Sequence, residues 1–378
     1  MNSLAALLRD LVAINSVNPT LAGGPGETEL ARWCTDWLRA AGLDPVLQEA
    51  APNRPNVVVL VAGQGQAPPL LLNAHLDTVG GEGMPAPLAL RQEGDRLYGR
   101  GGYDMKGSIA VLLELARSFA TTPPPGDLWI TLVADEEDLS VGTEALLRDW
   151  LPTLDRPPAA ALVLEPTEEN IGVAHKGFAW FEIEMQGRAA HGSRPDEGID
   201  AIMPLGAALT ELLAVETALA SQVPVPLLGT PSLHASTIAG GTAWSVYPAM
   251  ATLRWERRTL PGEDDLTLAS ELHRVVAAAQ RSTQAEVRGR HVFSRAPLGT
   301  PSDAAVVRAL HTAAPGARLV GLPFWTDGAL FSAAAIPTVL YGPIGHGAHA
   351  VDEWVSAASL ECVAATLRAL VAAGAWAA

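Results

Sequence analysis

The chain has 378 residues, of which 48% are hydrophobic and 17% are charged, so it can bury a large core and is not intrinsically disordered. Its 25 basic and 41 acidic residues give a net charge of −16 at pH 7, which argues against nucleic acid as a partner. No uncharged apolar run reaches the ~18 residues that cross a bilayer, so we expect no membrane insertion. The amino-terminal segment has amphipathic helical spacing and no basic leader, and it predicts a cytoplasmic protein.

The first part of the chain alternates between predicted strands and helices. A helix is expected over residues 27–41, and short apolar runs typical of buried parallel strands follow at 56–62, 70–74, 128–134 and 159–164. Helical patterns at 107–120 and 141–150 lie between several of these runs. This order predicts an α/β fold with a mostly parallel sheet flanked by helices. Cys34 and Cys362 both lie in helical apolar patterns and are expected to be buried free thiols.

A different pattern begins near His175. The expected order is a strand at 178–187, a helix at 199–220, two extended segments, a helix at 263–280 and a strand at 285–293, which is the β-α-β-β-α-β order of a ferredoxin-like domain. The earlier pattern resumes from Ser302. We therefore predict one domain made of residues 1–173 and 295–378, interrupted by an α+β domain of residues 174–294.

Acidic residues and a histidine follow the predicted strands of the first domain. Ligands bind at the carboxyl edge of an open α/β sheet. The residues expected at that edge are His75, Asp77, Asp104, Glu136, Glu137 and Glu165. Each has an ordinary explanation by itself, such as a buried strand-end histidine, a solvated acidic pair or a helix cap. Their joint occurrence at one edge favours a functional site instead.

The composition of this group favours divalent cations. The adjacent carboxylates of Glu136 and Glu137 repel each other unless a cation or a proton separates them. Three carboxylates, two zinc ions and a bridging hydroxide form a neutral cluster, and imidazoles would complete the coordination. His75 can serve one ion, and the second ion needs another histidine, for which the tail offers His346 and His349.

Seven motifs carry a resemblance to a known family. They occur in the order NAHLDTV, GRGGYDMKG, ADEED, LEPT, GRAAHGSRPDEGIDAI, RTLPGE and GAHAVDEWV. Over nearly the whole chain, the sequence resembles the zinc-dependent superfamily of acetylornithine deacetylase, succinyl-diaminopimelate desuccinylase, aminoacylase and glutamate carboxypeptidase. The resemblance implies a zinc-exopeptidase fold for the first domain and a lid and dimerisation role for the inserted one.

The resemblance also implies a role for each residue of the metal centre. Asp104 would bridge two ions, which are zinc, or else cobalt or manganese. His75 and Glu165 would complete one site. Glu137 and His349 would complete the other site, and His349 is preferred over His346 for this role. Asp77 would orient His75, and Glu136 would be the general base that acts on a metal-activated water.

Three residues of the inserted domain have implied roles in substrate binding and catalysis. His191 would reach across a homodimer to stabilise the oxyanion in the partner's site. Arg258 would bind the substrate carboxylate, with adjacent Arg257 as the alternative. Ser245 stands where the family often has Asn, which puts that polar contact to the substrate in doubt.

The predicted function is metal-dependent hydrolysis of the amide bond of an N-acyl amino acid or a short peptide. A carboxypeptidase or dipeptidase of the same superfamily is the alternative, since the catalytic centre would be the same. A noncatalytic ligand-binding protein on this fold is a remote alternative. The retention of Glu136 together with five presumed ligands argues against it.

Overall fold

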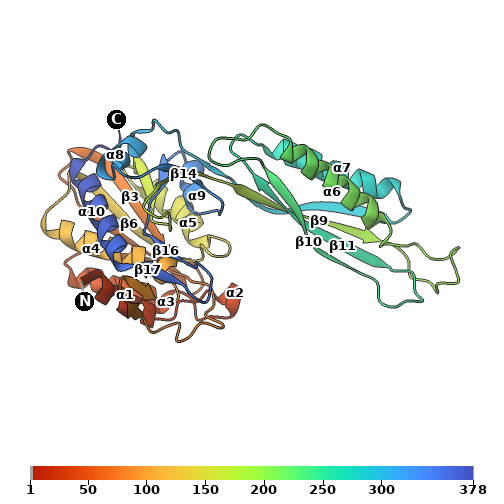
Figure 1. Cartoon of the computed structure of the whole chain (residues 1–378), viewed down its shortest axis with the longest axis horizontal. Helices are drawn as coiled ribbons and strands as arrows, with labels where there is room; N and C mark the ends of the chain where they lie inside the picture. Colours follow the sequence, from red (N-terminus) through yellow and green to blue (C-terminus); the bar gives the residue numbers. More distant parts are fainter. Residues whose placement is uncertain (1–2, 378) are drawn as a thin grey trace. The chain divides into compact units, whose positions relative to one another are not determined.

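A computed structural model describes residues 3–377 of the chain. The chain divides into two compact units. The first comprises Met1–Ala174, Gly299–Gly321 and Thr326–Ala378, and the second comprises His175–Leu298 and Leu322–Trp325 (Figure 1). Residues 295–298 and 322–325, which we expected in the first domain, group with the second unit, and residue 174, which we expected in the inserted domain, groups with the first.

The first unit is built on a nine-stranded mixed sheet of order β1-β2-β6-β3-β7-β15-β8-β13, with β14 also paired to β8. Its strands are β1 (Val46–Ala51), β2 (Arg54–Val61), β3 (Ala67–His75), β6 (Gly126–Val133), β7 (Ala160–Val163), β8 (Ile171–His175), β13 (Leu298–Gly299), β14 (Leu319–Leu322) and β15 (Thr338–Leu340). The central strands β6, β3, β7 and β15 are parallel to one another, as predicted.

One strand direction was predicted wrongly. The run at 56–62 becomes β2, which is antiparallel to β6 and forms an antiparallel pair with β1. A short apolar run shows that a strand is buried on both faces but does not show its direction. The direction is set here by the short connection from β2 to β3, which reverses the chain, and β3 is parallel to β6.

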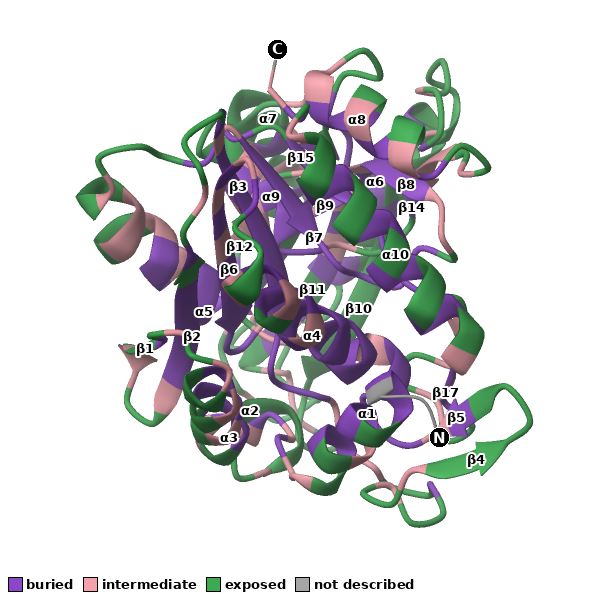
Figure 2. Cartoon of the chain, turned by 90° about the vertical axis from the view of Figure 1, so that its left-hand side faces the viewer, coloured by how far each residue is buried: buried purple, intermediate pink, exposed green. Residues whose placement is uncertain are grey.

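Helices cover the sheet and form the main core. The five that share this core are α1 (Ser3–Ala13), α3 (Thr28–Ala40), α4 (Gly107–Thr121), α8 (Ala305–Ala313) and α10 (Ala357–Ala373). In α4, Ile109, Leu112, Leu113 and Ala116 recur at helical spacing and are fully buried. Figure 2 shows the resulting pattern, with buried strands and an exposed outer face on α10.

The remaining elements of the first unit are short. A second, smaller core lies on the other side of the sheet, where Val58 and Val133 pack with Leu146. The short elements of the first unit are α2 (Pro19–Ala22), α5 (Val141–Ala145), α9 (Gly328–Ala333), the irregular turns Gly102–Lys106, Leu146–Trp150 and Leu151–Thr153, and a small sheet of β4 (Arg91–Glu93), β5 (Arg96–Tyr98), β16 (Gly345–His346) and β17 (Trp354–Ser356).

The second unit has the predicted β-α-β-β-α-β order. Its four-stranded antiparallel sheet has the order β10-β11-β9-β12, and two helices cover one face. The elements are β9 (Gly177–Gln186), α6 (Pro204–Ala220), β10 (Ser232–Gly240), β11 (Met250–Thr259), α7 (Asp265–Arg281) and β12 (Glu286–Arg295). Along β9, Phe181, Ile183 and Met185 alternate into the core under the helices, so the residues between them lie on the other face.

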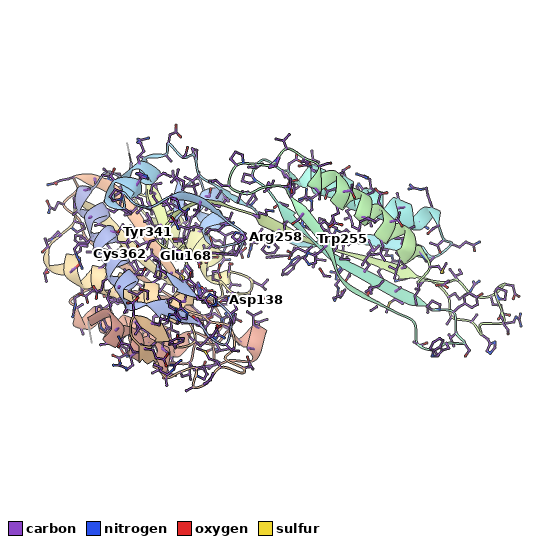
Figure 3. All side chains as sticks on the ribbon, in the orientation of Figure 1. Asp138, Glu168, Trp255, Arg258, Tyr341 and Cys362 are labelled. Atoms are coloured by element: carbon purple, nitrogen blue, oxygen red, sulfur yellow. The ribbon has the colours of Figure 1, made fainter. Side chains whose placement is uncertain are left out.

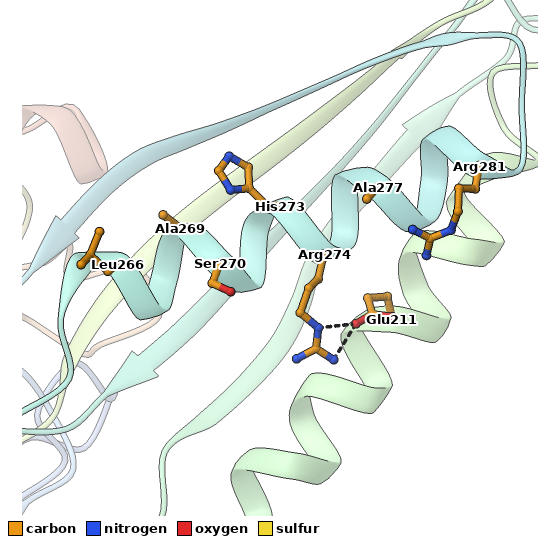
Figure 4. A pocket seen from close by; sticks show the side chains of 8 residues that line it. All are labelled: Glu211, Leu266, Ala269, Ser270, His273, Arg274, Ala277 and Arg281. Carbon is orange, nitrogen blue, oxygen red and sulfur yellow. Dashed lines mark hydrogen bonds and ion pairs between the residues drawn. The ribbon is translucent and has the colours of Figure 1, made fainter.

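A hollow of about 670 Å³ lies along α6 and α7 (Figure 4). Arg274 of α7 donates to Glu211 of α6, with a Nε to Oε1 distance of 2.8 Å. Because the Arg274 side chain is 52% exposed, this ion pair contributes only about 0–1 kcal/mol. The hollow is therefore an open surface feature beside an exposed ion pair.

Two other expectations concern single features. Cys34 is buried as expected, but Cys362 is exposed, because it lies on the outer side of α10. Helical spacing places a residue on a face, but neighbouring elements decide whether that face is covered. Among the described residues, no helix is long and apolar enough to cross a membrane.

Candidate metal centre

The register of three parallel strands brings the predicted ligands to one edge of the sheet. His75, the last residue of β3, pairs with Val133 at the end of β6. Asn73 of β3 pairs with Val163, the last residue of β7. Glu136, Glu137 and Glu165 follow β6 and β7 within four residues, so they emerge at the edge where His75 lies.

Asp104 lies between two imidazoles. Its Oδ1 is 3.0 Å from His75 Nε2, and its Oδ2 is 3.3 Å from His349 Nε2. The same His349 nitrogen is 2.8 Å from Glu137 Oε2. One carboxylate therefore directs a different oxygen to each of two histidines, which is the arrangement that a bridging ligand requires.

Several oxygens of this group have no hydrogen-bond partner among residues 3–377. They include Oε1 of Glu137 and Oε1 of Glu165, and both side chains are at least 95% buried. Buried carboxylate oxygens without a partner are rare, and a cation is a common reason for them. Ligand atoms of His75, Asp104 and Glu137 lie within 4.8 Å of one another, and so do those of His75, Glu136 and Glu165. The donor set of imidazole and carboxylate suits a transition metal ion such as zinc.

The electrostatics show that this centre lacks positive charge. Burial and the neighbouring carboxylate of Glu165 raise the pKa of Glu136 well above its usual value. Burial also raises the pKa of Glu165 well above its usual value, and Asp104 and Glu137 add to the effect. Divalent cations would supply the missing charge, so the residues present fit a metal site.

The pKa values of the two histidines are also raised, which in an imidazole favours the charged form. Hydrogen bonds to Asp104 and Glu137 raise the pKa of His349 to about 10. Burial opposes the charged form of His75, but its hydrogen bond to Asp104 prevails and raises the pKa well above the usual value. Both imidazoles therefore carry a proton at the place where a metal ion would be coordinated.

Asp77 contacts His75, and its side chain has a second set of partners. His75 Nδ1 is 2.9 Å from the backbone carbonyl oxygen of Asp77, whereas the carboxylate Oδ1 is 3.6 Å away. The Asp77 carboxylate instead accepts the backbone N–H groups of Glu136 and Glu137 at 3.1 and 3.2 Å. Asp77 thus orients the His75 ring through its main chain, so that Nε2 faces Asp104, and holds the acidic pair through its side chain.

The two tail histidines have different surroundings. His349 has a left-handed backbone conformation with φ of 64°, and its ring contacts Asp104 and Glu137. His346 lies in β16, its side chain is 64% exposed, and its nearest carboxylate is Asp352 at 3.7 Å. The geometry therefore supports His349 as the ligand and gives His346 no part in the centre.

The adjacent arginines of β11 point to opposite faces. Arg257 is fully buried and forms ion pairs with Glu263 and Glu271. Arg258 is partly exposed, donates to the backbone oxygen of Pro323 at 3.1 Å and is labelled in Figure 3. Arg257 is thus engaged inside the unit, whereas Arg258 is 20% exposed and contacts Glu256 and Pro323.

His191 and Ser245 lie on neighbouring segments of the second unit. His191 forms a β-bridge with Val246, and Gly192 donates to the backbone oxygen of Ser245 at 2.7 Å. Both residues are exposed, and His191 Nδ1 is 2.8 Å from the hydroxyl of Ser193. The structure therefore brings the two predicted residues together, and their roles in substrate binding stay predictions.

Comparison with known proteins identifies the family. Residues 71–373 match Peptidase family M20/M25/M40. The chain belongs to this family. It is 29% identical over 363 residues to the acetylornithine deacetylase of Edwardsiella ictaluri, covering 94% of this chain and 93% of that protein. The resemblance inferred from the motifs is thereby confirmed, and the family and this relative together make the chain a metal-dependent hydrolase of amide bonds.

Solved structures show the same fold. A tripeptidase from Staphylococcus aureus matches with a TM-score of 0.78 and 19% identity, covering 98% of this chain and 97% of that chain. An M20 family metallo-carboxypeptidase from Sulfolobus solfataricus matches with a TM-score of 0.76 and 17% identity, covering 99% of this chain and all of that chain.

Glu353 is an important residue of this family member that the sequence analysis did not single out. Its carboxylate is fully buried and accepts the backbone N–H groups of Gly101, Tyr103 and Asp104 at 3.1, 2.9 and 3.2 Å. It also accepts a hydrogen bond from Arg100 at 2.6 Å. Because Glu353 follows His349 by four residues, it ties the loop that carries Asp104 to the loop that carries His349.

A second buried network supports the acidic pair. Asn18 donates to Asp77 at 2.8 Å and to Asp135 at 3.0 Å, and Arg54 joins Asp135 at 2.7 Å to Glu27 at 2.6 Å. Asp135 immediately precedes Glu136 and has a left-handed φ of 69°. The network therefore fixes a strained backbone next to the predicted general base.

Asp327 adds a buried carboxylate that was also not foreseen. Its Oδ2 accepts a hydrogen bond from the Thr143 hydroxyl at 2.6 Å, and its Oδ1 has no partner among residues 3–377. Burial raises the pKa of Asp327 to about 6. Its charge in turn raises the pKa of Glu136 and of Glu165, so it lies within electrostatic reach of the centre.

Replacing Glu353 tests its supporting role. Glu353→Ala leaves Arg100 and three backbone N–H groups without their acceptor, so we expect a loss of about 3–5 kcal/mol in the free energy of unfolding. We also expect less bound zinc per chain, because the Asp104 loop loses its anchor. Urea unfolding and elemental analysis measure the two effects. Glu361→Ala removes an exposed carboxylate and serves as the control. Wild-type stability and metal content in Glu353→Ala would contradict this role.

Metal binding should release protons. The contacts with Asp104 and Glu137 raise the pKa of His349 from 6.5 to about 10. At neutral pH the imidazole therefore holds a proton that a metal ion must displace. Apparent zinc affinity should therefore rise with pH between about 6.5 and 10. Calorimetry in two buffers of different ionisation enthalpy counts the protons. His349→Asn should release fewer protons, and His346→Asn should match wild type. Zinc binding without proton release would contradict the arrangement.

Proposed function

We propose that the chain hydrolyses the amide bond of N-acyl amino acids, in the manner of an acetylornithine deacetylase. The observation that carries the proposal is the carboxylate of Asp104, which directs one oxygen to His75 and the other to His349. Glu136 lies beside this pair, with a ligand atom within 4.8 Å of those of His75 and Glu165, and a carboxylate held beside the ions can accept and return a proton. The acetylornithine deacetylase relative supports the substrate class.

Two zinc ions fit the donor set, with cobalt or manganese as alternatives. Asp104 would hold both ions, His75 and Glu165 would complete one site, and Glu137 and His349 would complete the other. When bound, such ions polarise the amide carbonyl and make water more acidic. The support for two ions is the unpartnered oxygens on Glu137 and Glu165, which lie on different residues of the cluster.

The chain's own residues would perform the remaining chemistry. Glu136 takes a proton from the attacking water and delivers it to the leaving amine. Asp77 holds Glu136 in place through the backbone N–H. Arg258 binds the free carboxylate of the substrate through its guanidinium, and Ser245 offers a hydroxyl where the family often has an amide.

A homodimer belongs to the proposal, because His191 would act on the substrate of the partner subunit. Strand β10 lies at an edge of the second unit's sheet, so its outer backbone groups are unpaired by the strands of that unit. Ile238 on β10, Trp244 and Met250 are exposed apolar residues near this edge, with exposed fractions of 58%, 109% and 55%. An apolar open edge suits pairing with a second copy.

A carboxypeptidase or dipeptidase is the second candidate. It would use the same metal ligands and the same Glu136, and two structural relatives are described as a tripeptidase and a metallo-carboxypeptidase. A cytoplasmic location is also part of the proposal, since two unpaired cysteines in the described chain suit a reducing compartment.

Replacing Glu136 tests the mechanism. Glu136→Gln keeps the size of the side chain but cannot accept the proton, so we expect kcat to fall by about 10²- to 10⁴-fold with zinc still bound. The assay uses N-acetyl amino acids, N-succinyl amino acids and dipeptides with metal-replete protein. Asp138→Asn removes a charge from the same turn and should keep wild-type turnover. Full activity in zinc-loaded Glu136→Gln would rule out Glu136 as the general base.

Mixed dimers test the role of His191. When His191→Ala and Glu136→Gln chains are mixed, a heterodimer has one site with Glu136 intact and His191 of the partner subunit in place. Random pairing should then restore roughly a quarter of wild-type activity, measured after co-refolding or co-expression. The separate variants serve as controls. No recovery in confirmed heterodimers would show that His191 does not act across the dimer.

A further inference from the structure

Asn56 is a fully buried amide near the start of β2. Because β2 runs antiparallel to β6, the first residues of β2 lie beside the last residues of β6. Val57 pairs with Leu132 at this end of the ladder. Asn56 therefore lies beside the start of the loop that follows β6 and carries Glu136 and Glu137.

Residues 134–142, which we call the acidic loop, have both ends bound to the amide of Asn56. Its Oδ1 accepts the backbone N–H of Ala134 at 3.0 Å, and its Nδ2 donates to the backbone oxygen of Gly142 at 2.8 Å. The backbone N–H of Gly142 also donates to the carbonyl oxygen of Ala134 at 3.1 Å. These hydrogen bonds join the two ends of the acidic loop to each other and to β2.

Close packing at Gly142 is a second, independent sign that the two ends are held together. A Cβ atom at this position would lie 2.5 Å from the nitrogen of Ala134 and 2.6 Å from Asn56 Oδ1, whereas real Cβ atoms stay beyond 3.0 Å. Gly142 lies in the short helix α5, so the close approach of the backbones, and not a left-handed conformation, requires glycine here. The junction therefore has no room for the ends to shift.

An amide suits this junction better than other side chains do. Asn56 has one acceptor and two N–H donors, and its second N–H donates to Gln48 Oε1 at 2.9 Å, so the amide is fully used. An aspartate could not donate to Gly142. A leucine of similar size would leave the buried N–H of Ala134 without this acceptor.

The acidic loop has a different support in its middle. The carboxylate of Asp77, which follows β3, accepts the backbone N–H groups of Glu136 and Glu137 at 3.1 and 3.2 Å. Asp77 thus fixes the middle of the loop relative to β3, and Asn56 fixes its ends relative to β2. Two strands together determine where the carboxylates lie, so loss of either support should displace them.

We propose that Asn56 is a positioning residue of this hydrolase, whose amide closes the acidic loop and thereby sets the positions of the carboxylates of Glu136 and Glu137. The inference rests on the proposed function, in which Glu136 is the general base and Glu137 a metal ligand. Asn56 acts through the loop backbone and has no contact with the reacting atoms in this role. Residues that orient metal ligands in this way change metal affinity or activity by about 10- to 100-fold when they are replaced.

Asn56→Leu tests the inference by replacing the amide with an apolar side chain of similar size. Zinc affinity, measured by competition with a chelator, should fall about 10- to 100-fold, because Glu137 is displaced from its place beside His349. In zinc-saturated protein, kcat on N-acetyl amino acids should fall by a similar factor. KM should change by less than about 3-fold, because the lost interaction places the general base and does not bind the substrate.

Three further variants separate position from stability. Gly142→Ala disturbs the same junction and leaves the amide in place, so zinc affinity and kcat should again fall at least about 10-fold. Gln48→Ala removes the third partner of the amide, keeps both bonds to the loop and should match wild type. Leu38→Ala removes a fully buried side chain of α3 from the main core, so it lowers stability but should keep kcat and zinc affinity in folded protein.

Circular dichroism shows whether each variant is folded at the assay temperature. Wild-type zinc affinity and kcat in folded Asn56→Leu or in folded Gly142→Ala would overturn the inference. Equal losses in Leu38→Ala would overturn it too, because they would be effects of stability alone. If Asn56→Leu does not fold, Asn56→Asp is judged by the same measurements. If neither folds, Asn56 serves the fold only and the inference fails.

Zinc affinity also separates failure of this inference from failure of the proposed function. If the wild type binds zinc but hydrolyses no N-acyl amino acid or dipeptide, while Asn56→Leu still weakens zinc binding, Asn56 positions Glu137 and the proposed function fails. If the wild type is active and Asn56→Leu keeps both kcat and zinc affinity, the hydrolase remains and the inference is wrong.

Discussion

Repulsion among carboxylates in a poorly solvating environment is the constraint on which the structure depends. Asp104, Glu136, Glu137 and Glu165 lie close together at one sheet edge, and burial raises the pKa values of all three glutamates. Protons or cations must balance such a group. The parallel register of β3, β6 and β7 places these residues at one edge, so the arrangement of the sheet itself creates the demand for cations.

Two further acids, Asp77 and Glu353, hold the backbone of the centre in place. The carboxylates of Asp77 and Glu353 each accept at least two backbone N–H groups, so their charge is already stabilised by hydrogen bonds. Glu137 and Glu165 retain oxygens without a partner. Asp77 and Glu353 therefore hold the backbone through satisfied carboxylates, whereas Glu137 and Glu165 each keep an oxygen for a ligand.

The sequence predicted the elements and the carboxyl-edge residues well, because apolar runs and strand ends are local features. It favoured His349 over His346 through the family motif, and the structure places only His349 against Asp104. The direction of β2 and the exposure of Cys362 were predicted wrongly, and the backbone contacts of the Asp77 carboxylate were not foreseen. The contacts of Glu353 and Arg54 span 249 to 253 and 27 to 81 residues, and no spacing rule within one segment can reveal contacts over such separations.

The two adjacent arginines of β11 lie in different surroundings in the second unit. Arg257 pairs with Ala179 in register and faces the core, where Glu263 and Glu271 neutralise it, whereas Arg258 pairs with Phe178. Because side chains alternate along a strand, a slip of one residue would exchange the two arginines between faces. It would bury the guanidinium available to a ligand and expose the one that the glutamates require. The buried ion pairs of Arg257 therefore oppose that slip and keep the guanidinium of Arg258 beside the ring of Phe178.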